Sequence, residues 1–237
     1  MQPPWNMTDY RLVFNNGDLE YTAYISLLDS PAGLPDHSFL TIYEKERLGR
    51  LSLTRANEFI ISRYLAKRAV CNVNRIEALK NVEIRTGVFG HPVLTMPAGN
   101  KHNNLSISHS DYSFAVIVFE EEHPVAIDIE SICPDKVKGL AYNLTEDETY
   151  LSKNCPILLT VLWTAKEALS KVLKCGLTVP YKILEVENIE TFENYFSGQY
   201  VSFSQYQFIS FFYQNNICSI VFPKKSKLAF NILIITN

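Results

Sequence analysis

The sequence lacks several features that mark specialised classes of protein. Its five cysteines are widely separated and form no Cys-x-x-Cys pair, the spacing typical of zinc and thiol-redox sites. No apolar run approaches the roughly 18 residues of a membrane-spanning helix, and the first residues show no basic segment followed by an apolar one. We therefore expect free thiols, a cytoplasmic location and no membrane partner.

The sequence also lacks a large excess of charge of either sign. The 22 Lys and Arg residues against 25 Asp and Glu give a formal net charge of −3. A protein that binds nucleic acid usually carries a basic excess on one face, so the balance argues against a nucleic-acid partner. An acidic protein partner would have to meet a local basic patch. With 237 residues, 47% of them hydrophobic, the chain can form one large domain or two small ones.

Patterns along the chain predict an α+β protein in two halves. The first half has a strand over 21–28 and helices between 38 and 78, and the second has helices over 145–174 and strands at 208–213 and 217–222. Short strands are expected at 104–107, 114–119 and 125–129, the last two joined as a hairpin through 120–124. Helices on antiparallel sheet thus occur twice. The expected division is 1–120 and 121–237.

Two carboxylates share one face of the strand at 125–129. Alternation along the strand places Val125, Ile127 and Ile129 on one face and Asp128 and Glu130 on the other. For an isolated Asp-x-Glu pattern, a half-buried strand with a solvated acidic edge is the commoner explanation.

The helix expected over 162–173 presents a third carboxylate. At about 100° per residue, Trp163, Glu167, Ser170 and Lys171 lie on a different face from the apolar stripe. An amphipathic helix with an exposed Glu-to-Lys pair would show the same pattern. Together, however, the strand and the helix offer hard oxygen ligands suited to Mg²⁺ and a lysine suited to a phosphate. The sequence does not by itself place these two elements side by side.

Four short fragments occur in a characteristic order over about 80 residues. They are Gly90-His91-Pro92, Leu105-Ser106-Ile107-Ser108-His109-Ser110, Ala126-Ile127-Asp128-Ile129-Glu130 and Trp163-Thr164-Ala165-Lys166-Glu167-Ala168. This series resembles the surfactin-type branch of the 4′-phosphopantetheinyl transferases. The segment 55–64 looks like the basic helix of that family, whereas the first 35 residues and those after about 180 agree only in length and texture.

The resemblance implies an activity, a fold and partners. Such enzymes move the 4′-phosphopantetheine arm of coenzyme A to a serine of an acyl or peptidyl carrier protein and release 3′,5′-ADP, as holo-acyl-carrier-protein synthases do. The reaction depends on Mg²⁺, with Mn²⁺ as an alternative. The fold implied has two similar α+β halves with the active site in the cleft between them, so that a monomer would suffice. The first half would contact the nucleotide, and the second would hold the metal.

The resemblance also assigns the catalytic residues. The magnesium ligands fall on Asp128, Glu130 and Glu167. Glu167 is also the candidate to deprotonate the carrier serine, directly or through water. Lys171 would bind coenzyme A and stabilise charge on the departing 3′,5′-ADP. The catalytic set implied is therefore Asp128, Glu167 and Lys171.

Coenzyme A contacts are implied for residues of the first half. His109, with Ser108 beside it, resembles the family histidine near the 3′-phosphate. Arg55 and Arg63 are candidate partners of the same phosphate, although solvated helix charges would have the same pattern.

A turn at Gly90, His91 and Pro92 is expected to border the adenine. His91 stands where the family often has lysine or arginine, which leaves one charged contact in doubt. Ser106 also departs from the commoner form of its motif. In the second half, the Thr145-to-Glu148 segment resembles another family motif, but we interpret it mainly as a helix cap.

Two other functions fit parts of the pattern. A magnesium-dependent hydrolase acting on a nucleotide diphosphate would need the same carboxylates and lysine, but no carrier protein. A non-catalytic module that binds coenzyme A or a carrier is the other alternative, although all three carboxylates and Lys171 are present. Lys136 and Lys138 are candidate contacts to an acidic carrier.

Overall fold

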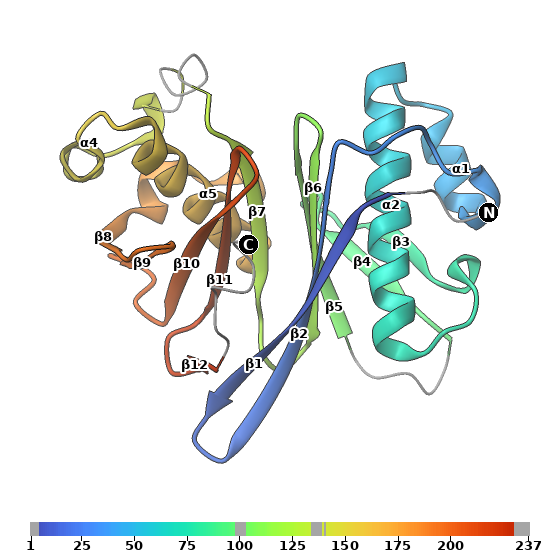
Figure 1. The fold of residues 1–237 in the computed structure, drawn as a ribbon, viewed down its shortest axis with the longest axis horizontal. Helices are drawn as coiled ribbons and strands as arrows, with labels where there is room; N and C mark the ends of the chain where they lie inside the picture. Colours follow the sequence, from blue (N-terminus) through green and yellow to red (C-terminus); the bar gives the residue numbers. More distant parts are fainter. Residues whose placement is uncertain (1–4, 98–102, 134–138, 140, 230–237) are drawn as a thin grey trace.

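The computed structural model describes residues 5–97, 103–133, 139 and 141–229 (Figure 1). It confirms the predicted α+β class. Within the described ranges, two five-stranded antiparallel sheets lie back to back, and each is covered on its outer face by helices. In the described part of the chain, no helix is long and apolar enough to cross a membrane.

The first sheet and its helices come mainly from the first half of the chain. In spatial order the sheet contains β12 (Lys227–Leu228), β1 (Met7–Asn16), β2 (Leu19–Asp29), β6 (Ser113–Glu120) and β5 (Asn103–Ser110). Its outer face is covered by α1 (Ile42–Leu48) and α2 (Leu53–Asn74), and a separate hairpin is formed by β3 (Glu83–Thr86) and β4 (Pro92–Thr95).

The second sheet repeats this arrangement with later residues. In spatial order it contains β7 (Ala126–Ser131), β11 (Asn216–Pro223), β10 (Tyr206–Tyr213), β9 (Tyr195–Tyr200) and β8 (Val186–Thr191). Its helices are α4 (Glu146–Ser152) and α5 (Pro156–Val172), the latter starting with proline, which suits the first turn because no helical partner exists there for an N–H. The chain passes between the sheets at 121–125, and β12 returns to the first sheet.

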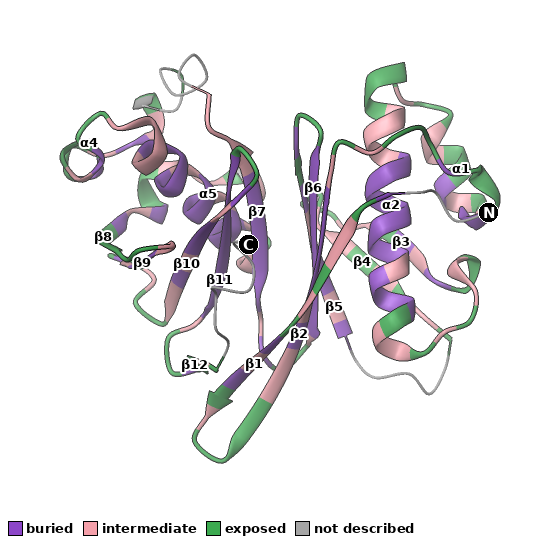
Figure 2. Cartoon of the chain, viewed as in Figure 1, coloured by how far each residue is buried: buried purple, intermediate pink, exposed green. Residues whose placement is uncertain are grey.

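The hairpin predicted for 114–129 is wrong. β6 pairs with β2 on one side and β5 on the other, so it has no free edge for β7, which pairs with β11 in the other sheet. The run of apolar residues in β6 reflects burial on both faces, because α2 covers one face and the second sheet covers the other. Figure 2 shows this continuous burial along β6.

Three apolar cores formed by described residues hold these layers together. One lies between α2 and the first sheet and another between α5 and the second sheet. The third lies between the two sheets and includes Phe14, Ile117, Ile127, Phe211 and Ile220. Because this central core joins residues of both halves, it fixes β7 against the first sheet, where the candidate site forms.

A buried ion pair anchors the helices of the first half. Thr41 and Glu44 form a capping box at the start of α1. The Glu44 carboxylate also accepts from the backbone N–H of Ile84 at 3.1 Å, and lies 2.5 Å from Lys67 of α2. Lys67 in turn donates to the carbonyl oxygen of Phe39 at 2.9 Å.

The second half contains the same arrangement. Thr145 and Glu148 form a capping box at the start of α4, which agrees with the predicted cap. Glu148 accepts from the N–H of Val186 at 2.9 Å and from Lys166 of α5 at 2.6 Å. Lys166 also donates to the carbonyl oxygen of Asn143 at 3.3 Å. This contact-by-contact correspondence indicates that the two halves share one structural plan.

Candidate active site

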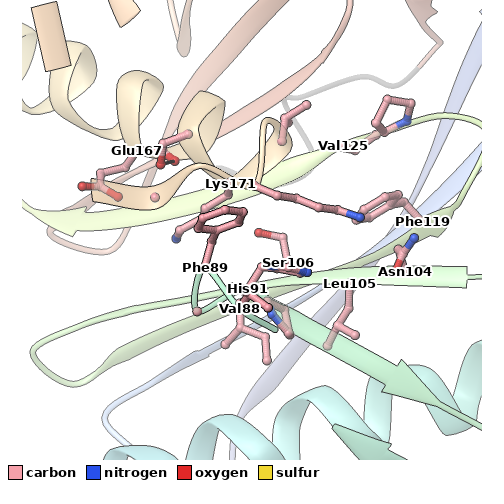
Figure 3. A pocket seen from close by; sticks show the side chains of 18 of the residues that line it. Val88, Phe89, His91, Asn104, Leu105, Ser106, Phe119, Val125, Glu167 and Lys171 are labelled. Atoms are coloured by element: carbon pink, nitrogen blue, oxygen red, sulfur yellow. Dashed lines mark hydrogen bonds between the residues drawn. The ribbon is translucent and has the colours of Figure 1, made fainter. Parts of the chain in front are cut away.

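A cavity of about 680 Å³ is lined by residues of both halves (Figure 3). The turn from Val88 to Pro92 and strand β5 contribute one side. Glu167 and Lys171 of α5 contribute the other, and Figure 3 shows them across the cavity from His91 and Ser106. Three of the four sequence-predicted fragments therefore line this cavity, through the turn at 90–92, residues 105–107 and Glu167, although they lie far apart in the chain.

Asp128 of β7 is linked to the lysine of α5. Its Oδ1 accepts hydrogen bonds from Lys171 Nζ and from Ser108 Oγ, both at 2.6 Å. Lys171 also donates to the carbonyl oxygen of Ile127 at 3.2 Å. The other oxygen, Asp128 Oδ2, is buried without a hydrogen-bond partner among the described residues. An unsatisfied carboxylate oxygen in this position is a ready acceptor for a ligand.

Glu167 lies close enough to Asp128 for the two charges to interact. Burial raises the pKa of Glu167, and the negative charge of Asp128 raises it further. A hydrogen bond from the Tyr181 hydroxyl and the positive charge of Lys171 act in the opposite direction. The site thus places two carboxylates together with one lysine to balance them.

Three serines of β5 connect the first sheet to β7. The backbone N–H groups of 127, 129 and 131 donate to the hydroxyl oxygens of Ser106, Ser108 and Ser110, respectively, at 3.2 to 3.4 Å. Ser110 donates in turn to Glu130 Oε2 at 2.7 Å, and Ser108 donates to Asp128. This serine ladder, defined by residues 106, 108 and 110, orients both carboxylates of the strand.

The residues fit a divalent cation in part. Within the described ranges, no group of three or more His, Cys, Asp or Glu side chains could hold a metal ion, so the three-ligand set with Glu130 stays a prediction. Asp128 and Glu167 nevertheless interact, one of them with an unpartnered buried oxygen and the other with a raised pKa. Mg²⁺ commonly takes one or two carboxylates and completes its shell with water and phosphate oxygens, so these two residues suit it.

His109 and Ser108, the candidate contacts of the 3′-phosphate, have different surroundings in the structure. The side chain of His109 is 40% exposed, and its Nε2 lies 4.0 Å from Glu58 Oε2. Partial burial lowers the pKa of His109, with the nearby Lys171 adding to this effect. The Ser108 hydroxyl proton points instead to Asp128. His109 is therefore the more exposed of the two, but neither residue is among the described residues that line the cavity, so their contact with a 3′-phosphate stays a prediction.

The two candidate arginines also differ. Arg55 is exposed in the first turn of α2, as the solvated-charge alternative expects. Arg63 is 8% exposed, and its guanidinium lies 4.7 Å from the ring centre of Phe59. Burial lowers the pKa of Arg63 to about 10. Neither arginine is among the described residues that line the cavity, so their contact with a 3′-phosphate stays a prediction.

The predicted turn at 90–92 lines the cavity. Gly90 has a φ of +84°, a conformation that L side chains rarely adopt. A Cβ at Gly87 would collide with the imidazole of His91, so the glycine makes room for that ring. His91 Nδ1 is buried without a partner among the described residues. Gly87 and Tyr181 are site residues that sequence reasoning missed, and no local pattern marks either.

Comparison with known proteins bears on the second half. Residues 124–221 match the model of the 4′-phosphopantetheinyl transferase superfamily. This range contains Asp128, Glu130, Glu167 and Lys171, whereas the superfamily match does not extend to the turn at 90–92. A search of curated proteins finds no match.

One matching solved structure is a holo-(acyl-carrier-protein) synthase from Bacillus anthracis str. Ames in complex with CoA (3′,5′-ADP). It is 27% identical to this chain, over 34% of this chain and 74% of that one, with a TM-score of 0.32.

Lys136 and Lys138, the candidate contacts to an acidic carrier, lie outside the described residues.

Proposed function

We propose that this chain transfers 4′-phosphopantetheine from coenzyme A to a serine of an acyl or peptidyl carrier protein. The observation that carries the proposal is the meeting of Asp128, Glu167 and Lys171 beside a cavity shared by both halves, within the range that matches the transferase superfamily. Dependence on Mg²⁺, with Mn²⁺ as a substitute, and membership of the surfactin-type branch form part of the proposal.

The reaction replaces one phosphorus–oxygen bond by another. The serine oxygen of the carrier bonds to the phosphorus of the pantetheine phosphate, and the bond to the departing 3′,5′-ADP breaks. Glu167 takes the serine proton, directly or through water, because its raised pKa suits a proton acceptor better than an ordinary carboxylate does. Lys171 stabilises the charge that develops on the leaving phosphate.

Asp128 and Glu167 would hold the cation, with Glu130 as a further ligand. A bound Mg²⁺ supplies charge neutralisation to the diphosphate of coenzyme A. Asp128 Oδ1 holds Lys171 against β7, and the buried Oδ2, which has no hydrogen-bond partner among the described residues, would be the ligand atom.

The nucleotide would lie against the first half. The cavity there is lined by Gly90, His91 and Pro92, and Phe89 and Leu105 add apolar side chains to its wall. His109 would meet the 3′-phosphate, with Arg55 or Arg63 as further partners. One chain supplies both sides of the cavity, which supports a monomer as the active form. We also expect the reaction to take place in the cytoplasm.

The experiment is the intact mass of an apo carrier protein incubated with the enzyme, coenzyme A and Mg²⁺, with and without EDTA. We expect the carrier to gain one phosphopantetheine group without EDTA and none with it. Analysis of the same mixtures for 3′,5′-ADP separates the alternatives. Release of 3′,5′-ADP without any carrier would indicate a hydrolase, and binding without release across several carriers would indicate a non-catalytic module.

A further inference from the structure

Tyr181 approaches Glu167 from a segment that the catalytic motifs do not include. After α5 ends, the backbone turns through left-handed conformations at Lys174 and Gly176. A short 3-10 turn, Tyr181–Leu184, then begins after Pro180. This reversal returns the chain to the helix, so that the Tyr181 hydroxyl donates a hydrogen bond to Glu167 Oε1.

The tyrosine ring is held by a second contact. Its centre lies 4.8 Å from that of Trp163, one helical turn before Glu167, with an interplanar angle of 34°. Aromatic pairs at this separation attract each other beyond the effect of area burial. The phenol is therefore fixed at one end by Trp163 and at the other by the carboxylate.

The Tyr181 hydroxyl is the donor of this hydrogen bond, and Glu167 Oε1 is its acceptor.

Tyr181 and Glu167 face different spaces. Glu167 lines the 680 Å³ cavity. Tyr181 lines an adjoining recess of about 470 Å³, together with Tyr142 and Lys182, and is not among the described residues that line the main cavity. The phenol thus contacts the carboxylate from the side of this recess and leaves the cavity side of Glu167 to a ligand.

We propose that Tyr181 is a positioning residue that fixes Glu167 through Oε1 and so presents Oε2 to the reaction. The inference rests on the proposed function of the site. Lys171 lies four residues after Glu167, the spacing at which a glutamate and a lysine pair on a helix. Without the phenol, Glu167 could turn to Lys171 and compete with Asp128 for it. Tyr181 prevents this exchange by occupying Oε1.

The test compares Tyr181→Phe, which keeps the ring against Trp163, with Tyr150→Phe, a control at a tyrosine that is 83% exposed. Mn²⁺ affinity is measured by electron paramagnetic resonance, and kcat and the KM for coenzyme A by carrier modification. For Tyr181→Phe we expect both Mn²⁺ affinity and kcat to fall about tenfold, with KM within about twofold and Tm nearly unchanged. The control should match the wild type in all of these.

A double-mutant cycle with Glu167→Gln separates positioning from general stability. If Tyr181 acts through Glu167, then adding Tyr181→Phe to Glu167→Gln should change Mn²⁺ affinity no further. An equal fall in both backgrounds would overturn the inference, as would a loss of Tm alone, wild-type Mn²⁺ affinity in Tyr181→Phe, or no Mn²⁺ binding by the wild type. If no carrier is modified but the Mn²⁺ cycle behaves as expected, the proposed function fails and the positioning role stands.

Discussion

The two halves of the molecule share a scaffold but differ in the residues that they place at one equivalent position. In each half a helix lysine, Lys67 or Lys166, pairs with the glutamate of a capping box. The residue after the lysine is Arg68 in the first half and Glu167 in the second. Corresponding helix positions therefore carry opposite charges.

The corresponding strand positions also differ, because one holds an aspartate and the other a neutral serine. Asp128 pairs with the fourth residue of β11, and Ser26 pairs with the fourth residue of β6. In the first half, Arg68 lies 2.7 Å from Asp9, and Ser26 donates to Asp9 at 2.6 Å. This network satisfies its own charges.

In the second half, Asp128 has an unpartnered oxygen and Glu167 a raised pKa. The comparison indicates that the same scaffold holds a paired network in the first half and an unpartnered carboxylate oxygen in the second.

The largest expected effect tests the shared scaffold. Lys67→Met and Lys166→Met should each lower the free energy of unfolding by about 3–5 kcal/mol, because each leaves a buried glutamate without its partner. Chemical denaturation measures this loss, with exposed Lys80→Met as the control. A large loss in one half and none in the other would contradict the structural equivalence.

A smaller expected effect is the pH dependence of stability that arises from His123, in the segment that joins the two halves. His123 is buried, lies 4.9 Å from the ring of Tyr21, and bonds Ser226 at 2.9 Å. Burial lowers the pKa of His123 to about 4. Below pH 6.5 the unfolded chain takes up a proton that the folded chain resists, so stability falls as pH decreases toward 4.

This loss should reach about 3 kcal/mol. His123→Gln removes the titrating group, so its free energy of unfolding should depend less on pH over this range. Denaturation at pH 7, 5.5 and 4 gives the comparison, and parallel pH profiles for the two proteins would count against the assignment.

The smallest effect concerns the serine ladder. Ser110→Ala removes a hydroxyl that accepts from a backbone N–H and donates to Glu130, so we expect a loss of about 1 kcal/mol in unfolding free energy. Ser202→Ala, at an exposed serine, should have almost no effect. Equal stability of these two variants would show that the ladder does not join β5 to β7.

Much of this arrangement could be predicted from local patterns. Alternation placed Asp128 and Glu130 on one face, and helical spacing placed Glu167 and Lys171 on another, because side-chain direction follows directly from residue number in regular elements. The capping box at Thr145 was predicted for the same reason. The order of the elements was sufficient to predict the α+β class.

The rest depends on contacts between distant residues. The hairpin error at β6 and β7 arose because two short apolar strands with a turn between them do not reveal which edges are already paired. Tyr181 reaches Glu167 only through the turn at Lys174 and Gly176, and the burial of Arg63 depends on packing around α2. No spacing in the sequence encodes these contacts.

We expect transfer to depend on Asp128 and Glu167 of the second half and not on the paired Arg68 of the first half. The most direct measurement is the mass of an apo carrier incubated with coenzyme A, Mg²⁺ and either Glu167→Gln or Arg68→Gln. We predict that Glu167→Gln lowers the rate of phosphopantetheine gain by about 100-fold or more, whereas Arg68→Gln stays within about twofold of the wild type. Equal modification rates for the two variants would contradict the account.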